Sequence, residues 1–356
     1  MATRRRKLVS NSLSLLITQI TQNATSLLFS ISVARILGPY TLGQYTLAFT
    51  FYFIFMTMSS QGLKTLLTRE LARHPENVEK CLVSGTALQF SFSTLAYIVL
   101  VVLVNLLPYR QATTLLCMVV GAAVIPFGLS NVTEAIFQSQ EKMHLITIST
   151  VPIYIIRLII MVGLLVANYS IQYAGVVLVL SEVIILVIEQ LLIRRIVKPK
   201  SLALDWDFIR TITLAARTFV AIESISVLKV RMQVLILSLL AGETVVGLYS
   251  AAVQLLQPFQ LISQSLAVAS LPTMARTVEA TDPRLRKLAE TVVAVLLVVA
   301  IPMIIGFFFI GGDFMVFLYR DPDFQLAGMA LTIAGLTMIP LSFTRALSYL
   351  LMARGY

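Results

Sequence analysis

Ionisable residues interrupt an apolar segment, TLAARTFVAIESISVLKVRMQVLILSLL (213–240), that is long enough to cross a membrane. It contains Arg217, Glu223, Lys229 and Arg231. Such groups cost several kcal/mol in hydrocarbon unless they are paired or wet, so they are functional candidates. Arginine binds phosphate in a bidentate way, and a carboxylate can hold a coupling proton or sodium ion. We therefore expect Arg217 and Arg231 to contact a phosphate-bearing substrate and Glu223 to bind a coupling ion.

Two further apolar segments carry ionisable residues with the same two potential roles. Arg345, within 326–350, is a third candidate for phosphate binding, and Glu182, within 171–193, is a second candidate for ion coupling. The alternative is mutual neutralisation, for example of Arg157 by Glu182 or Glu223. The sequence leaves both readings open.

Polar residues recur at helical spacing in the first apolar segment and in another near residue 258. In the first, steps of three and four residues place the polar side chains on one helix face. An amide at membrane depth needs a partner or water, so each stripe predicts one wall of a wet cavity. The stripes consist of Gln19, Gln22, Asn23, Ser26 and Ser30, and of Gln254, Gln257, Gln260 and Gln264.

No enzyme motif accompanies these residues. The sequence lacks a nucleophile elbow, a Walker A run and a metal-binding HExxH, and its two cysteines and two histidines form no metal-ligand pattern. We therefore expect no catalytic residues, no metal site and no cofactor. Because 58% of the 356 residues are hydrophobic and only 12% are charged, the composition excludes a soluble enzyme and a nucleic-acid-binding domain.

The sequence instead predicts an all-α polytopic membrane protein with about ten transmembrane helices. Under the positive-inside rule, 19 of the 27 Lys and Arg residues fall on one side and three on the other, with both ends of the chain cytoplasmic. The predicted spans are 12–34, 41–63, 83–107, 113–136, 145–167, 171–193, 213–240, 247–270, 290–311 and 326–350.

An internal repeat divides these spans into two lobes. At an offset of 204 residues, LGPYTLGQYTLAF (37–49) matches AGETVVGLYSAAV (241–253), with Gly38 opposite Gly242. Six spans separate the copies, so they enter the membrane in the same direction as parallel repeats. We expect a six-helix lobe at 1–200 and a four-helix lobe at 201–356 that lacks its last two helices.

The segments VARILGPYTLGQYTLAFTF (33–51) and VRMQVLILSLLAGETVVGLYSAAVQLLQP (230–258) resemble the polysaccharide-biosynthesis branch of the multidrug/oligosaccharidyl-lipid/polysaccharide (MOP) exporter superfamily, which includes the O-antigen flippases of the Wzx type. The resemblance implies two six-helix lobes that alternate between inward-open and outward-open states. It also implies an Arg-x-Asp pair, of which Arg231 is present while Gln233 stands at the acidic position. Glu223 is then the alternative carboxylate.

The resemblance implies a flippase that moves a polyprenyl-diphosphate-linked oligosaccharide, an O-antigen or other surface polysaccharide unit, from the cytoplasmic to the outer face of the inner membrane. The implied partners are this substrate, membrane lipid, a coupling H+ or Na+, glycan polymerase and glycosyltransferases, and no nucleic acid. An antiporter for organic cations in the same superfamily is the second hypothesis. A membrane glycan polymerase or ligase is the third, disfavoured by short outer loops.

Overall fold

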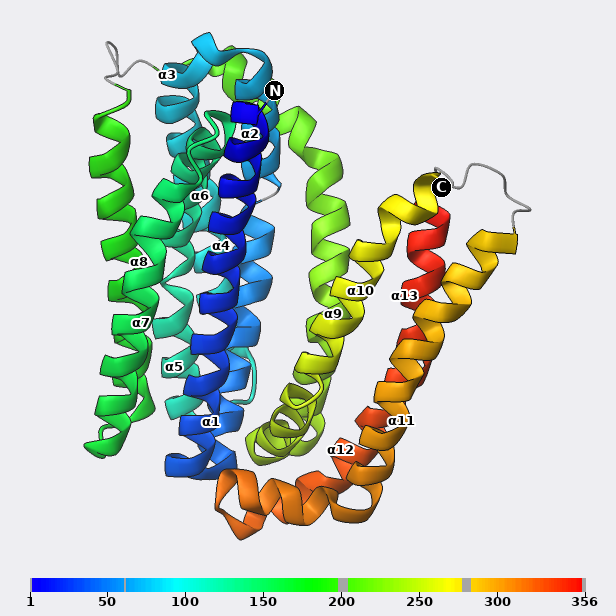
Figure 1. Cartoon of the computed structure of the whole chain (residues 1–356). Coiled ribbons are helices and arrows are strands. Elements are labelled where there is room, and N and C mark those ends of the chain that lie inside the picture. Colours follow the sequence, from blue (N-terminus) through cyan, green and yellow to red (C-terminus); the bar gives the residue numbers. More distant parts are fainter. Residues whose placement is uncertain (1, 61, 198–203, 277–282, 354–356) are drawn as a thin grey trace. The chain divides into compact units, whose positions relative to one another are not determined.

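The computed structural model describes residues 2–60, 62–197, 204–276 and 283–353, and within these ranges every regular element is a helix (Figure 1). Mean segment hydropathy predicted this all-helical architecture, and the structure confirms it. The helices of the first part of the chain are α1 (Ala2–Ser60), α2 (Leu63–Arg73), η1 (Pro75–Asn77), α3 (Val78–Lys80), η2 (Cys81–Gly85), α4 (Thr86–Leu106), α5 (Gln111–Gly121), α6 (Val124–Ser139), α7 (His144–Val166) and α8 (Ile171–Arg194). Those of the second part are α9 (Trp206–Gln254), α10 (Gln257–Arg276), α11 (Pro283–Tyr319), η3 (Pro322–Leu326), α12 (Ala327–Leu336) and α13 (Met338–Ala353).

Eight helical segments among the described residues are long and apolar enough to cross a membrane. Ten spans were predicted, and the difference lies in two long segments, Ser10–Arg73 and Val220–Leu266. Their lengths of 64 and 47 residues each exceed twice the roughly 20 residues that one crossing needs. Each of them overlaps two predicted spans.

The long helices α1 and α9 are each interrupted by one glycine. Gly38 has φ 75° and ψ −177°, and Gly242 has φ 78° and ψ 180°. This region of backbone space is open essentially to glycine alone, and it breaks the helical path. The two glycines are the pair that the 204-residue repeat had matched, so a shared backbone conformation supports the repeat.

The chain divides into two compact units at these glycines. Unit 1 comprises residues 1–37 and 43–246, and unit 2 comprises 38–42 and 247–356. Each interrupting segment, 38–42 and its repeat equivalent 242–246, therefore belongs with the unit formed mainly by the other repeat. The predicted division into lobes at 1–200 and 201–356 stays a prediction.

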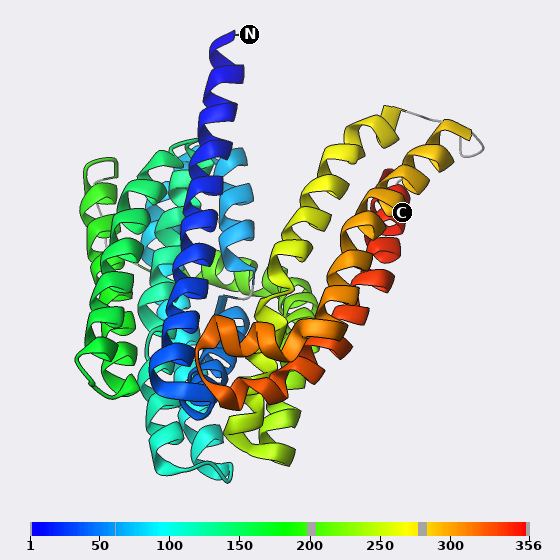
Figure 2. The same ribbon diagram turned by 60° about the horizontal axis from the view of Figure 1, so that its bottom comes forward.

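Unit 1 is a bundle in which α6 packs against α2, α4 and α8, while α7 lies beside α8 (Figures 1 and 2). Small residues allow the close approach, as is common between membrane helices. A Cβ atom on Gly128 of α6 would stand 2.2 Å from Ser93 Oγ and 2.7 Å from Gln89 Nε2 of α4. The Gln89 amide in turn donates to the carbonyl of Ser59 at 3.2 Å. The interior of unit 1 is thus fixed by glycine contacts and buried hydrogen bonds.

Unit 2 is built around α11, which contacts α10, α12, α13 and η3. A Cβ atom on Gly328 of α12 would stand 2.5 Å from the backbone nitrogen of Gly312 in α11. At the end of α11, the Tyr319 ring stacks on Phe324 with 4.5 Å between centroids, and its hydroxyl donates to the Ala251 carbonyl at 3.2 Å. These contacts join the last residues of α9, 247–254, to the rest of unit 2.

Asp205 caps the start of α9. Its Oδ1 accepts from the Phe208 backbone N–H at 2.9 Å, and its Oδ2 lies 2.9 Å from Lys80 Nζ. The backbone hydrogen bond, followed by Lys80, holds the pKa of the Asp205 carboxyl below its ordinary value. A lowered pKa contributes stability above the unfolded value, near pH 4, that is lost as the pH falls through the folded value.

We therefore expect Asp205→Ala to lower the midpoint of thermal unfolding at neutral pH and to lose this effect in acid. The measurement is unfolding in detergent at several pH values, with Asp207→Ala, an exposed residue two positions later, as the control. A deficit that stays constant down to roughly pH 2, well below the ordinary aspartate pKa, would contradict the assignment.

Candidate functional site

A buried ion pair joins α7 and α8 inside unit 1. Arg157 Nη1 donates to Glu182 Oε1 at 2.8 Å and to Ser181 Oγ at 3.3 Å. The guanidinium carbon lies 4.7 Å from the centre of the Tyr154 ring. The Arg157 and Glu182 side chains are only 12% and 7% exposed. The sequence allowed Arg157 to pair with Glu182 or with Glu223, and the structure contains the pair with Glu182. Glu182, a candidate for ion coupling, is therefore already neutralised by Arg157.

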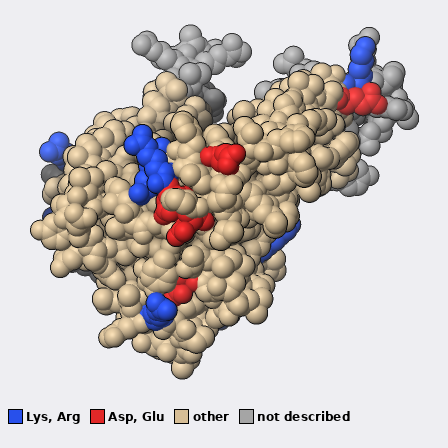
Figure 3. All heavy atoms as spheres, turned by 90° about the horizontal axis from the view of Figure 1, so that it is seen from below, with Lys and Arg blue, Asp and Glu red and all other residues tan. Residues whose placement is uncertain are grey.

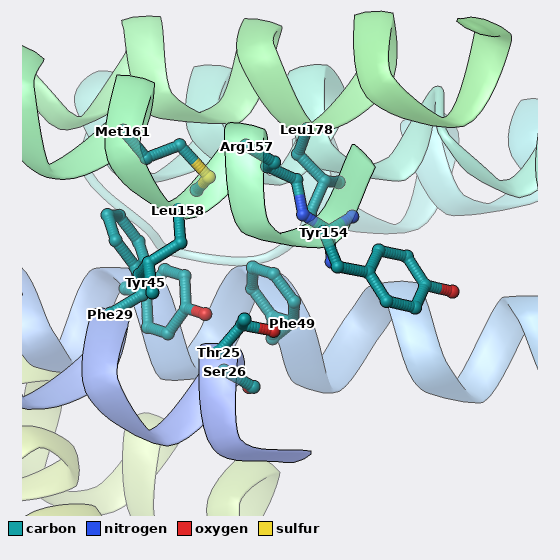
Figure 4. A pocket seen from close by; sticks show the side chains of 10 residues that line it. All are labelled: Thr25, Ser26, Phe29, Tyr45, Phe49, Tyr154, Arg157, Leu158, Met161 and Leu178. Atoms are coloured by element: carbon teal, nitrogen blue, oxygen red, sulfur yellow. The ribbon is translucent and has the colours of Figure 1, made fainter. Parts of the chain in front are cut away.

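A small cavity adjoins this pair (Figure 4). Figure 4 shows Tyr154 and Arg157 of α7 opposite α1 residues, among them Ser26 and Phe49. Its volume of about 30 Å³ matches one water molecule and is far too small for a sugar. The cavity is therefore a small pocket of unit 1 whose lining is mostly apolar. Its lining consists of Thr25, Ser26, Phe29, Tyr45, Phe49, Tyr154, Arg157, Leu158, Met161 and Leu178.

The predicted polar stripe of α1 lies only partly outside the packed core of unit 1, because Ser26 borders the small pocket and Ser30 is buried. Gln19, Asn23 and Ser26 are exposed and Gln22 is half-buried. The nearby contact of α1 with α7 uses other residues, since Thr18 Oγ1 donates to Thr147 Oγ1 at 3.1 Å. In a membrane-spanning helix, exposed amides are far less costly beside water than beside lipid.

Arg231 of α9 lies against an aromatic series on α1. Its guanidinium carbon is 4.5 Å from the centre of the Phe53 ring, which is cation–π geometry. Arg231 is half-buried. The neighbouring ring pairs are Phe29–Tyr45 at 5.2 Å, Tyr45–Phe49 at 4.4 Å, Phe49–Tyr52 at 5.9 Å and Phe49–Phe53 at 6.1 Å.

The other ionisable candidates of α9 are spread along the helix. Arg217 is exposed, and Glu223 is half-buried within reach of the backbone N–H of Gly62. Arg217 and Arg231 are 14 residues apart, which corresponds to about 21 Å of helix. The structure therefore does not bring the two arginines together at one place.

The remaining predicted residues lie in unit 2. Gln257 is exposed at the start of α10, and its cavity-lining role stays a prediction. The backbone of Arg345 lies in α13, but its side chain is outside the described part of the structure. The basic residues Lys198, Lys200 and Arg354 of the orientation argument also lie outside the described residues.

A hydrogen-bond chain holds the segment that follows Gly242. Thr113 Oγ1 of α5 donates to Glu243 Oε1 at 2.9 Å and accepts from Gln44 Nε2 at 2.9 Å. Beside it, the hydroxyls of Tyr109 and Ser238 lie 2.8 Å apart. This chain fixes the interrupted part of α9 to α1 and α5 within unit 1. Figure 3, seen from below, shows mostly uncharged residues on the face it presents.

The structure also brings forward residues that the sequence analysis did not select. The aromatic series has a sequence signal, because Tyr45, Phe49 and Phe53 recur every four residues and so share a helix face. The pairing of Lys64 with Glu134 had no signal in the sequence, since these residues are 70 positions apart. No group of three metal-ligating side chains occurs among the described residues.

Comparisons with known proteins give one family match and a set of structural likenesses. The sequence profile of a family described as Polysaccharide biosynthesis protein matches residues 8–278. No curated protein matches closely enough to count as a relative. The likeness to solved structures below rests on 14–15% identity and therefore concerns the fold.

Three solved structures illustrate this likeness. A MOP superfamily transporter from Pyrococcus furiosus has a TM-score of 0.61 at 15% identity, with 98% of this chain and 82% of that chain covered. A eukaryotic MATE transporter has a TM-score of 0.61 at 14% identity, with 98% and 83% covered. An inward-facing multidrug resistance MATE family transporter of the MOP superfamily has a TM-score of 0.65 at 14% identity, with 97% and 84% covered.

Proposed function

Because the chain belongs to the polysaccharide biosynthesis protein family, we propose that it is a transporter of the MOP superfamily and, more closely, a flippase for polyprenyl-diphosphate-linked oligosaccharides. The chain is a multi-pass membrane protein of a transporter family. The observation that carries the finer assignment is Arg231, a half-buried guanidinium held against Phe53 at the end of an aromatic series. A basic group beside aromatic rings fits a substrate that combines a diphosphate with sugars.

The physical task is to move a charged, heavily hydroxylated headgroup past hydrocarbon. Each unpaired polar group would cost several kcal/mol there, so the headgroup needs a wet, polar route while the prenyl tail stays in lipid. Arg231 offers charge-assisted hydrogen bonds to phosphate, and the ring of Phe53 beside it offers an apolar surface to sugars. Arg217, about 21 Å away along α9, would take the diphosphate at another stage.

The exposed polar residues extend this proposed route. Gln19, Gln22 and Asn23 on α1 and Gln257 on α10 would solvate the sugars by hydrogen bonding, and Arg345 is a further candidate for the diphosphate. Glu223, which is half-buried and forms no ion pair among the described residues, is preferred over Glu182 as the candidate for H+ or Na+ coupling.

The remaining parts of the proposal concern topology and partners. We place the protein in the inner membrane with both ends of the given chain cytoplasmic, because most basic residues fall on that side. Transport then runs outward by alternating access between lobes at 1–200 and 201–356. Glycosyltransferases would supply the lipid-linked substrate, and a glycan polymerase would consume it.

The test is translocation of a fluorescent lipid-linked oligosaccharide in vesicles containing the purified protein. Loss of a charge-assisted phosphate contact corresponds to about 1.5–3 kcal/mol, so Arg231→Ala is expected to slow translocation by about tenfold to a hundredfold. Lys229→Ala, an exposed cation two residues away on the same helix, is the matched control and retains most of the rate. Wild-type rates after combined replacement of Arg217 and Arg231 by Ala would refute the assignment.

A second candidate function is export of organic cations. It is favoured by the likeness to a multidrug resistance MATE family transporter. Such a substrate needs free acidic groups, yet Glu182 is paired with Arg157 and Glu134 with Lys64. The same vesicles decide between the two functions, because drug export predicts uptake of a fluorescent organic cation that the oligosaccharide lipid does not inhibit.

A further inference from the structure

A groove opens on unit 1 between α4 and α8. Its walls come from η2 and α4 on one side and from the end of α8 on the other, and α6, which packs against both helices, contributes Leu129. The volume of about 1010 Å³ lies at the upper end of the range of small-molecule pockets. None of the described residues that line it belongs to the aromatic series of α1 or to the small pocket beside Arg157. The groove is therefore separate from the proposed substrate route.

Hydrogen bonds fix the walls of this groove. The backbone N–H of Asp205 donates to Ser84 Oγ of η2 at 3.0 Å, which holds the preceding lining residue, Leu204, beside η2. On the opposite wall, Gln190 Nε2 of α8 donates to Thr133 Oγ1 of α6 at 3.1 Å. The groove is thus set by the packing of unit 1.

The groove is apolar along most of its lining. Eight of its eleven lining residues are apolar. Two of these, Phe90 and Leu204, are 51% and 42% exposed. Along α4 the lining extends from Leu82 to Phe90, which corresponds to about 12 Å of helix. In a membrane, this surface suits part of a lipid acyl chain, because the groove removes little polar surface from water or headgroups.

One end of the groove carries a positive charge. Arg194, the last residue of α8, lines the groove and is exposed. It forms no ion pair with a described residue, and no described residue of the lining is acidic. A guanidinium binds phosphate through charge-assisted hydrogen bonds, and basic pockets between transmembrane helices bind anionic lipid headgroups.

A tryptophan marks the level of this charged end. Trp206, two residues after Leu204, is 72% exposed, and exposed tryptophans of membrane proteins concentrate at the headgroup level. Arg194 is also the last residue of a candidate membrane span. Figure 1 shows α3 and the end of α8 at the same end of the bundle. Arg194 therefore lies at the level of lipid phosphates, and the groove runs from it toward the hydrocarbon.

We propose that this groove binds one anionic phospholipid of the surrounding leaflet, with its phosphate on Arg194 and part of one acyl chain along α4. The charge argues for a phospholipid, because one guanidinium balances the single negative charge of a phosphodiester, whereas a diphosphate carries more. The orientation predicted from the basic loops places this site in the cytoplasmic leaflet. Lipid binding here does not depend on the proposed flippase function.

Trp206, the single tryptophan of the chain, provides the measurement. It lies within about 7 Å of Leu204 along the backbone. The full chain is placed in phosphatidylcholine vesicles that contain a brominated phospholipid, whose bromine atoms quench tryptophan fluorescence on contact. Half-maximal quenching is expected at an about fivefold lower mole fraction of brominated phosphatidylglycerol than of brominated phosphatidylcholine. This preference corresponds to about 1 kcal/mol for one basic residue near an anionic lipid.

Three variants locate the site. Arg194→Ala is expected to remove the preference for phosphatidylglycerol. Arg195→Ala, at the next and equally exposed arginine outside the groove lining, is the matched control and keeps most of it. Ala87→Phe fills the groove without changing its charge, so more brominated phosphatidylglycerol is needed for the same quenching.

Equal quenching of wild type by the two lipids would overturn the site. An equal loss of preference in Arg194→Ala and Arg195→Ala would also overturn it, since general surface charge would then explain the binding. A competition with unbrominated lipids tests the occupant. If a polyprenyl phosphate displaces brominated phosphatidylglycerol at a mole fraction at which phosphatidylglycerol displaces none, the groove holds the substrate tail and the phospholipid assignment is wrong.

Discussion

Glu182→Gln is expected to lower the free energy of unfolding by about 3–5 kcal/mol, because it leaves the buried Arg157 guanidinium without its counter-charge. The substitution keeps the shape of the side chain, so packing contributes little to the loss. Thermal or denaturant unfolding in detergent measures it. The same change at the exposed residue Glu76 is the control and is expected to alter stability by no more than about 0.5 kcal/mol.

The double variant Arg157→Met/Glu182→Met separates pairing from burial. Replacing both members of a buried ion pair by apolar residues of similar volume is often nearly neutral, so most of the stability lost in Glu182→Gln should return. A double variant as unstable as the single one would contradict the pairing. If the double variant folds and still transports, the pair is structural, and Glu182 is removed from the candidates for ion coupling.

The fold was largely predictable because its determinants are local in sequence. Hydropathy alone gives the helical spans, and the glycine at position 38 has a counterpart at position 242 in a matching run. The structure adds that both glycines adopt the same φ near 75–78°. A periodic or repeated sequence pattern predicts local backbone conformation, because the pattern and the conformation involve the same residues.

The partners of the charged residues were not predictable in the same way. Glu182 and Glu189 are seven residues apart and share a face of α8, but sequence does not tell which neighbours that face meets. The structure gives Glu182 an arginine 25 residues away, and it gives Glu189 the Ser149 hydroxyl 40 residues away. Such pairings depend on the rotation and axial shift of whole helices, which the packing of many side chains sets together.

Gly242→Ala and Gly163→Ala make the same chemical change with opposite expected effects. At both positions, a new Cβ atom would meet nothing within 4 Å, so neither variant creates a clash. Gly242 has φ 78°, where any other residue is strained by about 1–3 kcal/mol. Gly163 lies inside the regular helix α7, where alanine is favoured by about 0.5–1 kcal/mol. Gly242→Ala should therefore lower the unfolding midpoint in detergent, and Gly163→Ala should raise it.

Gly38→Ala tests whether the two matched glycines contribute equally to stability as well as sharing a backbone conformation. With φ 75° and its closest new contact, Asp321 Oδ2, at an ordinary 3.4 Å, it should lose about as much stability as Gly242→Ala. Equal stability of Gly242→Ala and Gly163→Ala would show that backbone strain does not set the interruption of α9. A loss at Gly38 without a loss at Gly242 would show that only the first repeat needs its glycine. Gly38 begins the segment 38–42 of unit 2, and Gly242 lies four residues before the boundary between units at 246/247. Losses at both would show that the backbone conformation near these boundaries contributes to stability.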